Sequence, residues 1–202
     1  FERPETFRAA AAGCDAVFLL RPPAIRDVGS TLCPFVDEAR FVGARHVVFL
    51  SVAGADRRRW VPHRAVEQHL EAQDAPYTIL RPGFFAQNLE GAYLRDIRED
   101  NRLYVPAGRG RVAFVDLDDV ADAAVPIFAD AETHTGAAYT LTGPCAVSFE
   151  AVADALTSAV GRRIRYEPAS LLGYGRHLKR RGLSPMQILV QTVLHVGIRF
   201  GD

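Results

Sequence analysis

The side chains of this sequence that could do chemistry lie close to the ends of short apolar runs. Ser51 directly follows the run His46–Leu50, and His63 falls in the first turn of a helix expected to begin at Pro62. A histidine with a pKa near its ordinary value of about 6.5 can donate or accept a proton at neutral pH. A serine hydroxyl at a strand end can bind a ligand or simply close a turn, and both interpretations of Ser51 remain open.

His63 also has an ordinary structural interpretation, because Glu67 follows it by one helical turn and the two side chains can pair there. His69 is six residues from His63 and lies on another helical face, which argues against a zinc pair. The carboxylates at 116–122 suit a helix amino end and solvent, so we expect no metal site. The chain contains neither a Gly-x-Ser-x-Gly motif nor a cysteine–histidine nucleophile pair.

Composition excludes several other classes of protein. The chain has 202 residues, 49% of them hydrophobic, and its 24 Lys and Arg balance its 24 Asp and Glu, which argues against nucleic-acid binding. Three widely spaced cysteines predict a reduced, cytoplasmic protein without a structural metal. No apolar run is long enough for a membrane span, so no membrane association is expected. The chain begins at Phe1 with a helical pattern close behind, and we expect it to be a segment of a longer protein.

Buried strands alternate with amphipathic helices along the chain. This alternation predicts an α/β fold with a doubly wound parallel Rossmann-like sheet. Strands are expected at 16–20, 46–50, 77–80 and 139–142, with shorter extended pieces at 103–105, 112–115 and 163–166. Helices are expected at 4–12, 27–42, 62–73, 89–99, 117–129, 149–160, 170–181 and from 185 onward. We predict a Rossmann-like domain at 1–143 and a small carboxyl-terminal α+β subdomain at 144–202.

In an open α/β sheet, ligands bind outside the carboxyl ends of the strands. Three segments occupy such ends here, and each contains proline or glycine: Leu20–Pro23, Ser51–Asp56 and Arg81–Phe85. Proline and glycine also end strands where no ligand binds, and that alternative remains open. Their occurrence at three successive strand ends favours the wall of a ligand site.

The same segments carry a resemblance to a known family. The runs Phe-Leu-Leu-Arg-Pro-Pro (18–23), Val-Phe-Leu-Ser with Gly-Ala-Asp (48–56) and Tyr-Thr-Ile-Leu-Arg-Pro-Gly-Phe-Phe with Asn-Leu (77–89) resemble the NmrA-like group of atypical short-chain dehydrogenase/reductase relatives. Val-Asp-Leu-Asp-Asp-Val-Ala-Asp (115–122) and Tyr-Thr-Leu-Thr-Gly-Pro (139–144) resemble it too, in order. The family's first strand and its Gly-x-x-Gly-x-x-Gly turn are not in the chain, so on the order of 50 residues are expected to precede it. The strand at 16–20 would then be the fourth.

The resemblance implies NAD(P) binding, with NADP favoured over NAD. It places Leu20, Arg21, Pro22 and Pro23 along the cofactor, and Ser51, Val52, Ala53, Pro82, Gly83, Phe84 and Phe85 beside its nicotinamide. Phe84, Phe85 and Asn88 would face the substrate. The usual Tyr-x-x-x-Lys pair is absent. When the family pattern is aligned on Glu67, Arg59 takes the Tyr position and His63 takes the Lys position. His63 and Ser51 are therefore the candidate catalytic residues, with His63 also contacting the cofactor.

Two functions remain open after this reasoning. The first is an NAD(P)H-dependent reductase of a small carbonyl, quinone or imine compound, since hydride transfer needs only a positioned nicotinamide and a pocket. The alternative is a non-catalytic redox sensor that binds NAD(P) and regulates a protein partner. Whether the protein is an enzyme, which compound it acts on and how many copies assemble are not indicated by the sequence.

Overall fold

A computed structural model describes residues 1–201, which form two compact units. Unit 1 comprises residues 1–83 and 117–142, and unit 2 comprises residues 84–116 with those from 143 onward. The chain passes from unit 1 to unit 2 for the last time between Thr142 and Gly143. Residues 84–116, which the sequence analysis assigned to the first domain, pack within unit 2, so each unit is assembled from two stretches of chain.

Unit 1 is built on a four-stranded parallel sheet in the order β1-β2-β3-β7. Its strands are β1 (Ala16–Leu20), β2 (His46–Leu50), β3 (Tyr77–Pro82) and β7 (Ala137–Leu141). Leu20, Leu50, Leu80 and Tyr139 are register partners in turn across the sheet. The carboxyl ends of the strands therefore meet at one edge, and the predicted parallel α/β fold is confirmed.

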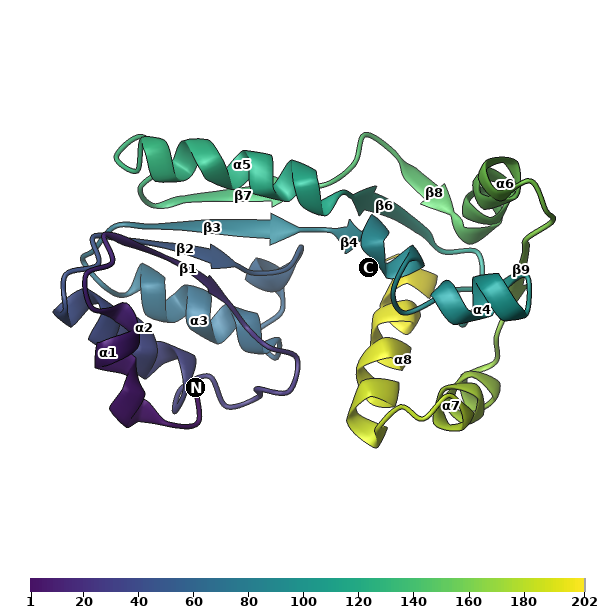
Figure 1. Cartoon of the computed structure of the whole chain (residues 1–202), viewed down its shortest axis with the longest axis horizontal. Coiled ribbons are helices and arrows are strands. Elements are labelled where there is room, and N and C mark those ends of the chain that lie inside the picture. The colour runs from purple at the N-terminus through teal and green to yellow at the C-terminus, as the bar shows by residue number, and fades with distance from the viewer. Residues whose placement is uncertain (202) are drawn as a thin grey trace. The chain divides into compact units, whose positions relative to one another are not determined.

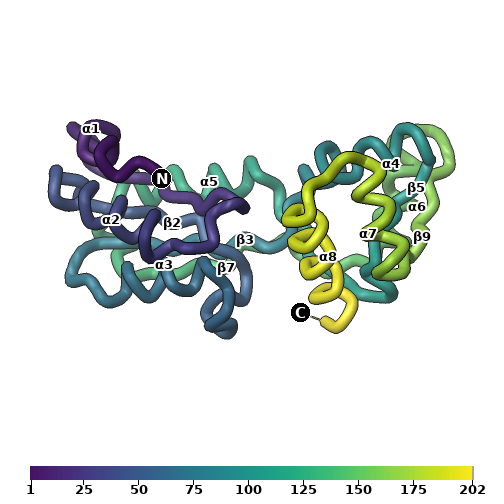
Figure 2. Tube along the Cα trace, turned by 90° about the horizontal axis from the view of Figure 1, so that it is seen from below, coloured from purple at the N-terminus to yellow at the C-terminus, as the bar shows by residue number. Residues whose placement is uncertain are grey.

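Helices cover both faces of this sheet, as Figures 1 and 2 show. One face carries α1 (Phe7–Ala11), α2 (Leu32–Phe41) and α3 (Pro62–Glu71), and the other carries α5 (Leu117–Ala129). Phe49 of β2 is fully buried in the cluster that joins the sheet to α2 and α3. Val48, the next residue towards the amino end, packs with Ile127 of α5. Alternate residues of one strand thus fill two cores, as the continuous apolar run predicted.

β1 differs from the expectation of a strand covered on both faces. Leu19 is buried, but Phe18 is 42% exposed and Leu20 48% exposed. The Phe18 ring lies near α5, with its centroid 6.3 Å from that of Phe128. Among residues 1–201, β1 pairs with β2 alone, so its other edge is open. The apolar run at 16–20 is therefore half-covered in this chain.

Helix starts follow local chemistry. Pro34 lies in the first turn of α2, so the helix expected from residue 27 begins late, at Leu32, where a proline is tolerated. Ser148 accepts a hydrogen bond from the Ala151 N–H and caps α6 (Phe149–Val160), the helix expected at 149–160. Ser184 and Gln187 form a complete capping box at the start of α8.

Unit 2 is a small α+β body. Its strands are β4 (Phe84–Phe85), β6 (Arg111–Val115) and β8 (Ala146–Ser148) in one sheet, and β5 (Arg102–Val105) paired in parallel with β9 (Arg165–Pro168). Its helices are α4 (Leu94–Glu99), α6 (Phe149–Val160), α7 (Leu171–Arg180) and α8 (Pro185–Arg199). Residues 1–201 also contain three short 3-10 helices. Unit 1 has η1 (Pro4–Thr6) and η2 (Ala55–Arg57), and unit 2 has η3 (Ala86–Leu89).

Two elements of unit 2 differ from the sequence expectation. The helix expected from residue 89 begins only at Leu94, because η3 and a turn containing Gly91 come first. β8 was not expected, since three residues are too few to show a periodic pattern; it pairs antiparallel with β6. Within residues 1–201, no helix combines the length and apolar character that crossing a bilayer requires.

Candidate functional site

A buried carboxylate lies just behind the carboxyl edge of the unit 1 sheet. Glu67 on α3 is fully buried, and the Ser51 hydroxyl at the end of β2 donates to its Oε1 at 2.6 Å. Arg81 near the end of β3 donates from Nε to Oε1 and from Nη2 to Oε2, both at 2.9 Å. Arg64 adds a bond to Oε2 at 3.0 Å. Two neighbouring strands and a helix are thereby joined through one side chain.

The surroundings of Glu67 keep it ionised. Burial alone would raise the pKa of this carboxyl, but the hydrogen bonds from Arg81, Ser51 and Arg64 together hold the pKa below its usual value. Ser51 is itself only 2% exposed, and its proton is donated to Glu67. The hydrogen bond to Glu67 gives the Ser51 hydroxyl a structural role.

Arg21 organises the loop that follows β1. Its Nη1 donates to the carbonyls of Pro22 at 3.1 Å, Pro23 at 3.3 Å and Ile25. The Ile25 N–H in turn bonds the Pro22 carbonyl at 3.0 Å, which closes the turn. The loop is therefore folded around a guanidinium, and burial lowers the pKa of Arg21 without removing its charge at neutral pH.

The same guanidinium contacts His63. Arg21 Nε lies 3.3 Å from His63 Nε2, which joins the β1 loop to the first turn of α3. A guanidinium has only donors, so His63 Nε2 must be the acceptor and the ring hydrogen must be on Nδ1. Burial, and then the Arg21 charge, lower the pKa of His63 to about 4. His63 is therefore a neutral imidazole at neutral pH, with one defined tautomer.

The Nδ1 of His63 is a buried donor without a partner among the described residues. Such orphaned donors are uncommon in folded proteins, because leaving one unsatisfied costs about 1–3 kcal/mol. The pairing of His63 with Glu67 that the sequence allowed is not formed: the hydrogen bonds to Glu67 within residues 1–201 come from Ser51, Arg64 and Arg81. His63 consequently retains a buried donor that no described residue satisfies.

Backbone pairing continues beyond the strands at the same edge. The Ser51 N–H bonds the Leu80 carbonyl at 2.7 Å, and the Ala53 N–H bonds the Pro82 carbonyl at 2.9 Å. Gly54 then takes a left-handed conformation with φ +75°, and a Cβ there would lie 3.1 Å from the Arg58 guanidinium. Residues 51–53 are thus held beside residues 80–82.

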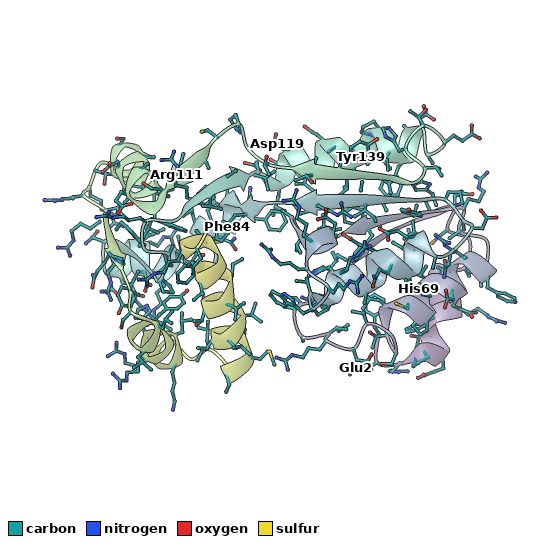
Figure 3. All side chains as sticks on the ribbon, turned by 180° about the vertical axis from the view of Figure 1, so that it is seen from behind. Glu2, His69, Phe84, Arg111, Asp119 and Tyr139 are labelled. Atoms are coloured by element: carbon teal, nitrogen blue, oxygen red, sulfur yellow. The ribbon has the colours of Figure 1, made fainter. Side chains whose placement is uncertain are left out.

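The three candidate residues on the substrate side belong to unit 2. Phe84, marked in Figure 3, is only 7% exposed and packs edge-on to Phe114 within that unit's core. Phe85 in β4 and Asn88 in η3 are half-buried. Phe84 thus contributes mainly to the core, which makes Phe85 and Asn88 the better candidates for ligand contact.

Sequence reasoning missed the partners of Arg81 and the contact between Arg21 and His63. The sequence predicts Arg81 at a strand end that borders a ligand site, and a charged residue inside a buried strand also signals an internal ion pair. His69, also marked in Figure 3, bonds Asp37 of α2 at 2.8 Å and serves to pack α3 on α2. No group of three or more His, Cys, Asp or Glu in the described part of the chain is arranged to hold a metal.

Comparison with known proteins agrees with this architecture. A family model described as NAD(P)H-binding matches residues 1–131. The NAD(P)H azoreductase of Xenophilus azovorans is 34% identical over 174 residues, which are 83% of this chain and 59% of the azoreductase. The chain therefore spans about three fifths of that relative's length.

Solved structures show the same fold at lower identity. The Citrobacter sp. triphenylmethane reductase, complexed with NADP(H), superposes with a TM-score of 0.85 at 22% identity, covering 99% of this chain and 72% of the reductase. NmrA, a negative transcriptional regulator in complex with NAD, superposes with a TM-score of 0.69 at 18% identity, covering 95% of this chain and 64% of NmrA.

The expected resemblance is confirmed by these matches, and the family model covers β1, β2, β3 and α3, the elements that carry or border Arg21, Ser51 and His63. The neutral histidine and the paired strand-end loops sit where open α/β sheets bind ligands. This chain belongs to the NAD(P)H-binding family.

Proposed function

We propose that this protein is an NAD(P)H-dependent reductase of a small carbonyl, quinone or imine compound. The family match and the reductase relatives support this function. The observation that carries it in this chain is the buried, unpartnered Nδ1–H of neutral His63 at the carboxyl edge of the sheet. A fixed neutral donor in that position can bind a ligand oxygen without exchanging a proton with solvent.

The residues present suit the nicotinamide half of the cofactor. His63 Nδ1 would donate to a hydroxyl or carbonyl of the bound cofactor or substrate, and the strand-end segments Leu20–Pro23, Ser51–Ala53 and Pro82–Gly83 would form the wall. When bound, the reduced nicotinamide supplies the hydride. We favour NADP(H), because the triphenylmethane reductase structure contains it. The chain has no Gly-x-x-Gly-x-x-Gly turn, so its own residues include no glycine-rich pyrophosphate loop of that kind.

The roles of the remaining candidates follow from their partners. Ser51 would act as a positioning residue, because its proton is committed to Glu67. Phe85 and Asn88 would contact the substrate. Arg21 would keep His63 neutral and in one tautomer. The replacement of the usual Tyr-x-x-x-Lys pair then has a chemical counterpart: a neutral donor would hold the ligand oxygen, and the proton that completes the reduction would come from water.

The test is reductase activity of the full-length native protein with NADPH and a panel of quinones, aldehydes and imines, followed by the loss of reduced-nicotinamide absorbance. We expect turnover, and His63→Ala should lower kcat/KM by about tenfold or more, the cost of one hydrogen bond in the transition state. His69→Ala is the matched control on the same helix, and it should leave kcat/KM unchanged.

A redox sensor is the second candidate, favoured by the likeness to NmrA and by the replaced Tyr and Lys positions. Cofactor binding without turnover of any acceptor, together with a protein partner whose affinity changes with cofactor, would support it. Turnover that is insensitive to His63→Ala would instead remove His63 from the proposed site.

A further inference from the structure

An exposed aromatic side chain lies beside unpaired cations on the loop between β2 and α3. Trp60 is the only tryptophan of the chain, and it is 71% exposed. An indole is rarely left so open to water, because its burial removes a large apolar surface. Arg57 and Arg59 precede it by three residues and one residue, are also exposed, and form no ion pair among the described residues.

The loop is built by closed turns. Ala55 is fully buried and anchors η2, while the Arg58 N–H bonds the Ala55 carbonyl at 3.2 Å. The Val61 N–H then bonds the Arg58 carbonyl at 3.1 Å, so a closed turn spans Arg59 and Trp60. Trp60 is therefore exposed on a loop whose backbone is held by hydrogen bonds.

Charge on this loop is one-sided. It carries three consecutive arginines and one acid, Asp56. The Asp56 carboxylate lies 3.9 Å from Nη1 of Arg81, the arginine that also pairs with Glu67. Trp60 precedes His63 by three residues, and the loop starts at Ser51, so it borders the candidate site within unit 1. A guanidinium binds sulfonate or carboxylate oxygens, and an indole stacks on a flat ring.

We propose that Arg57, Arg59 and Trp60 form a subsite for a flat aromatic anion, which would be the electron acceptor of the reductase proposed above. The ring of the acceptor stacks on the Trp60 indole, and its anionic group is bound by Arg57 and Arg59. Only the role of this ligand as an electron acceptor rests on the proposed function; the binding of a flat aromatic anion does not depend on it.

The single tryptophan makes the subsite directly measurable. Quenching of Trp60 emission in the 202-residue chain would be titrated with an azobenzene monosulfonate, its uncharged hydroxymethyl counterpart and its cationic trimethylammonium counterpart. We expect the sulfonate to bind about tenfold or more tighter than the uncharged ring, a difference of about 1.4 kcal/mol. The preference should shrink as salt is added.

Three variants separate the parts of the subsite, with binding followed by equilibrium dialysis. Arg57→Gln/Arg59→Gln should abolish the preference for the sulfonate and leave binding of the uncharged ring unchanged. Trp60→Ala should weaken both ligands, and Trp60→Phe should restore part of that loss. Lys179→Gln/Arg180→Gln removes two exposed charges from α7 and is the matched control, with the preference retained.

Equal quenching by all three probes, or an unchanged preference in Arg57→Gln/Arg59→Gln, would overturn the subsite. Displacement of the sulfonate by NADP⁺ added without an acceptor would also overturn it, because Arg57 and Arg59 would then bind the cofactor. If the full-length protein turns over uncharged quinones while sulfonate binding has no advantage, the reductase stands and the subsite fails. If the sulfonate binds with this preference but no acceptor is reduced, the subsite stands and the reductase fails.

Discussion

Arg21 Nε and His63 Nε2 lie 3.3 Å apart, although 42 positions separate the two residues in the chain. The contact joins a permanently charged donor to a titratable ring, and it decides three properties of His63. The ring accepts at Nε2, carries its hydrogen on Nδ1, and resists a second proton because that proton would place two cations side by side.

The first prediction concerns the pKa of His63. Arg21→Gln should raise it from about 4 towards the ordinary value, though not fully, because burial is the larger cause of the depression. Arg21→Lys keeps the charge and should keep the pKa low. NMR titration of the His63 ring signals in each variant measures this directly. Arg26→Gln, which removes an exposed charge from the same loop, is the control; a His63 pKa unaffected by Arg21→Gln would show that the guanidinium has no such role.

The second prediction concerns activity at different pH values. Because His63 titrates at about pH 4, its protonation should produce no limb in the kcat/KM profile between about pH 5 and 8. In Arg21→Gln an acid limb should appear at a higher pH. A wild-type limb near pH 6.5 that disappears in His63→Ala would contradict the neutral state of the ring.

The third prediction concerns the buried carboxylate. Glu67→Gln leaves Arg81 and Arg64 without their carboxylate, so it should lower the unfolding free energy by about 3–5 kcal/mol. Ser51→Ala removes one bond to a charged group and should cost about 1.5–3 kcal/mol. Denaturant unfolding measures both. Glu71→Gln, which affects a partly exposed pair with Arg64, should change stability by no more than about 1 kcal/mol; equal losses for Glu67→Gln and Glu71→Gln would argue against the network.

The fourth prediction concerns acid stability of unit 2. His195 is fully buried, its Nδ1 donates to the Gln191 carbonyl, and Tyr93 donates to its Nε2 at 2.7 Å. Burial lowers its pKa to about 4, below the ordinary 6.5, so the unfolded chain takes up the proton first. The stability contributed by neutral His195 is complete above about pH 6.5 and is lost as pH falls towards 4, by up to about 3 kcal/mol.

His195→Gln preserves a donor and an acceptor and should remove this part of the pH dependence. The unfolding free energy of wild type and His195→Gln would be measured at neutral and acidic pH. His69→Gln, which alters the exposed His69–Asp37 pair, is the control. An identical pH slope in wild type and His195→Gln would rule out His195 as its source.

The fifth prediction concerns the open edge of β1. An apolar strand edge without a partner promotes association between chains. Phe18→Lys/Leu20→Lys should therefore reduce self-association of the 202-residue chain, as measured by light scattering over a range of concentrations. Phe41→Lys changes a more exposed apolar side chain, at the end of α2, and should have little effect. If both variants associate alike, the edge is not the cause.

Much of this molecule was determined by the sequence alone. The apolar runs at 16–20 and 46–50 became β1 and β2 with the expected bounds, because a short run between turn-forming residues has few other ways to be buried. Ser148 and Ser184 began their helices as predicted, since capping depends on only a few neighbouring residues. Parallel strand order then placed the ends of β1, β2 and β3 at one edge, and with them the candidate site.

The tertiary structure alone decided which side chains meet there. Arg21 contacts His63 and Arg81 contacts Glu67 across strands, and residues 84–116 pack with the carboxyl-terminal part instead of the sheet that precedes them. A local pattern reports whether a residue is buried, but a hydrogen-bond partner depends on chain segments brought together by folding. The sequence therefore predicted where a candidate site lies, and the fold determined the protonation state of its histidine.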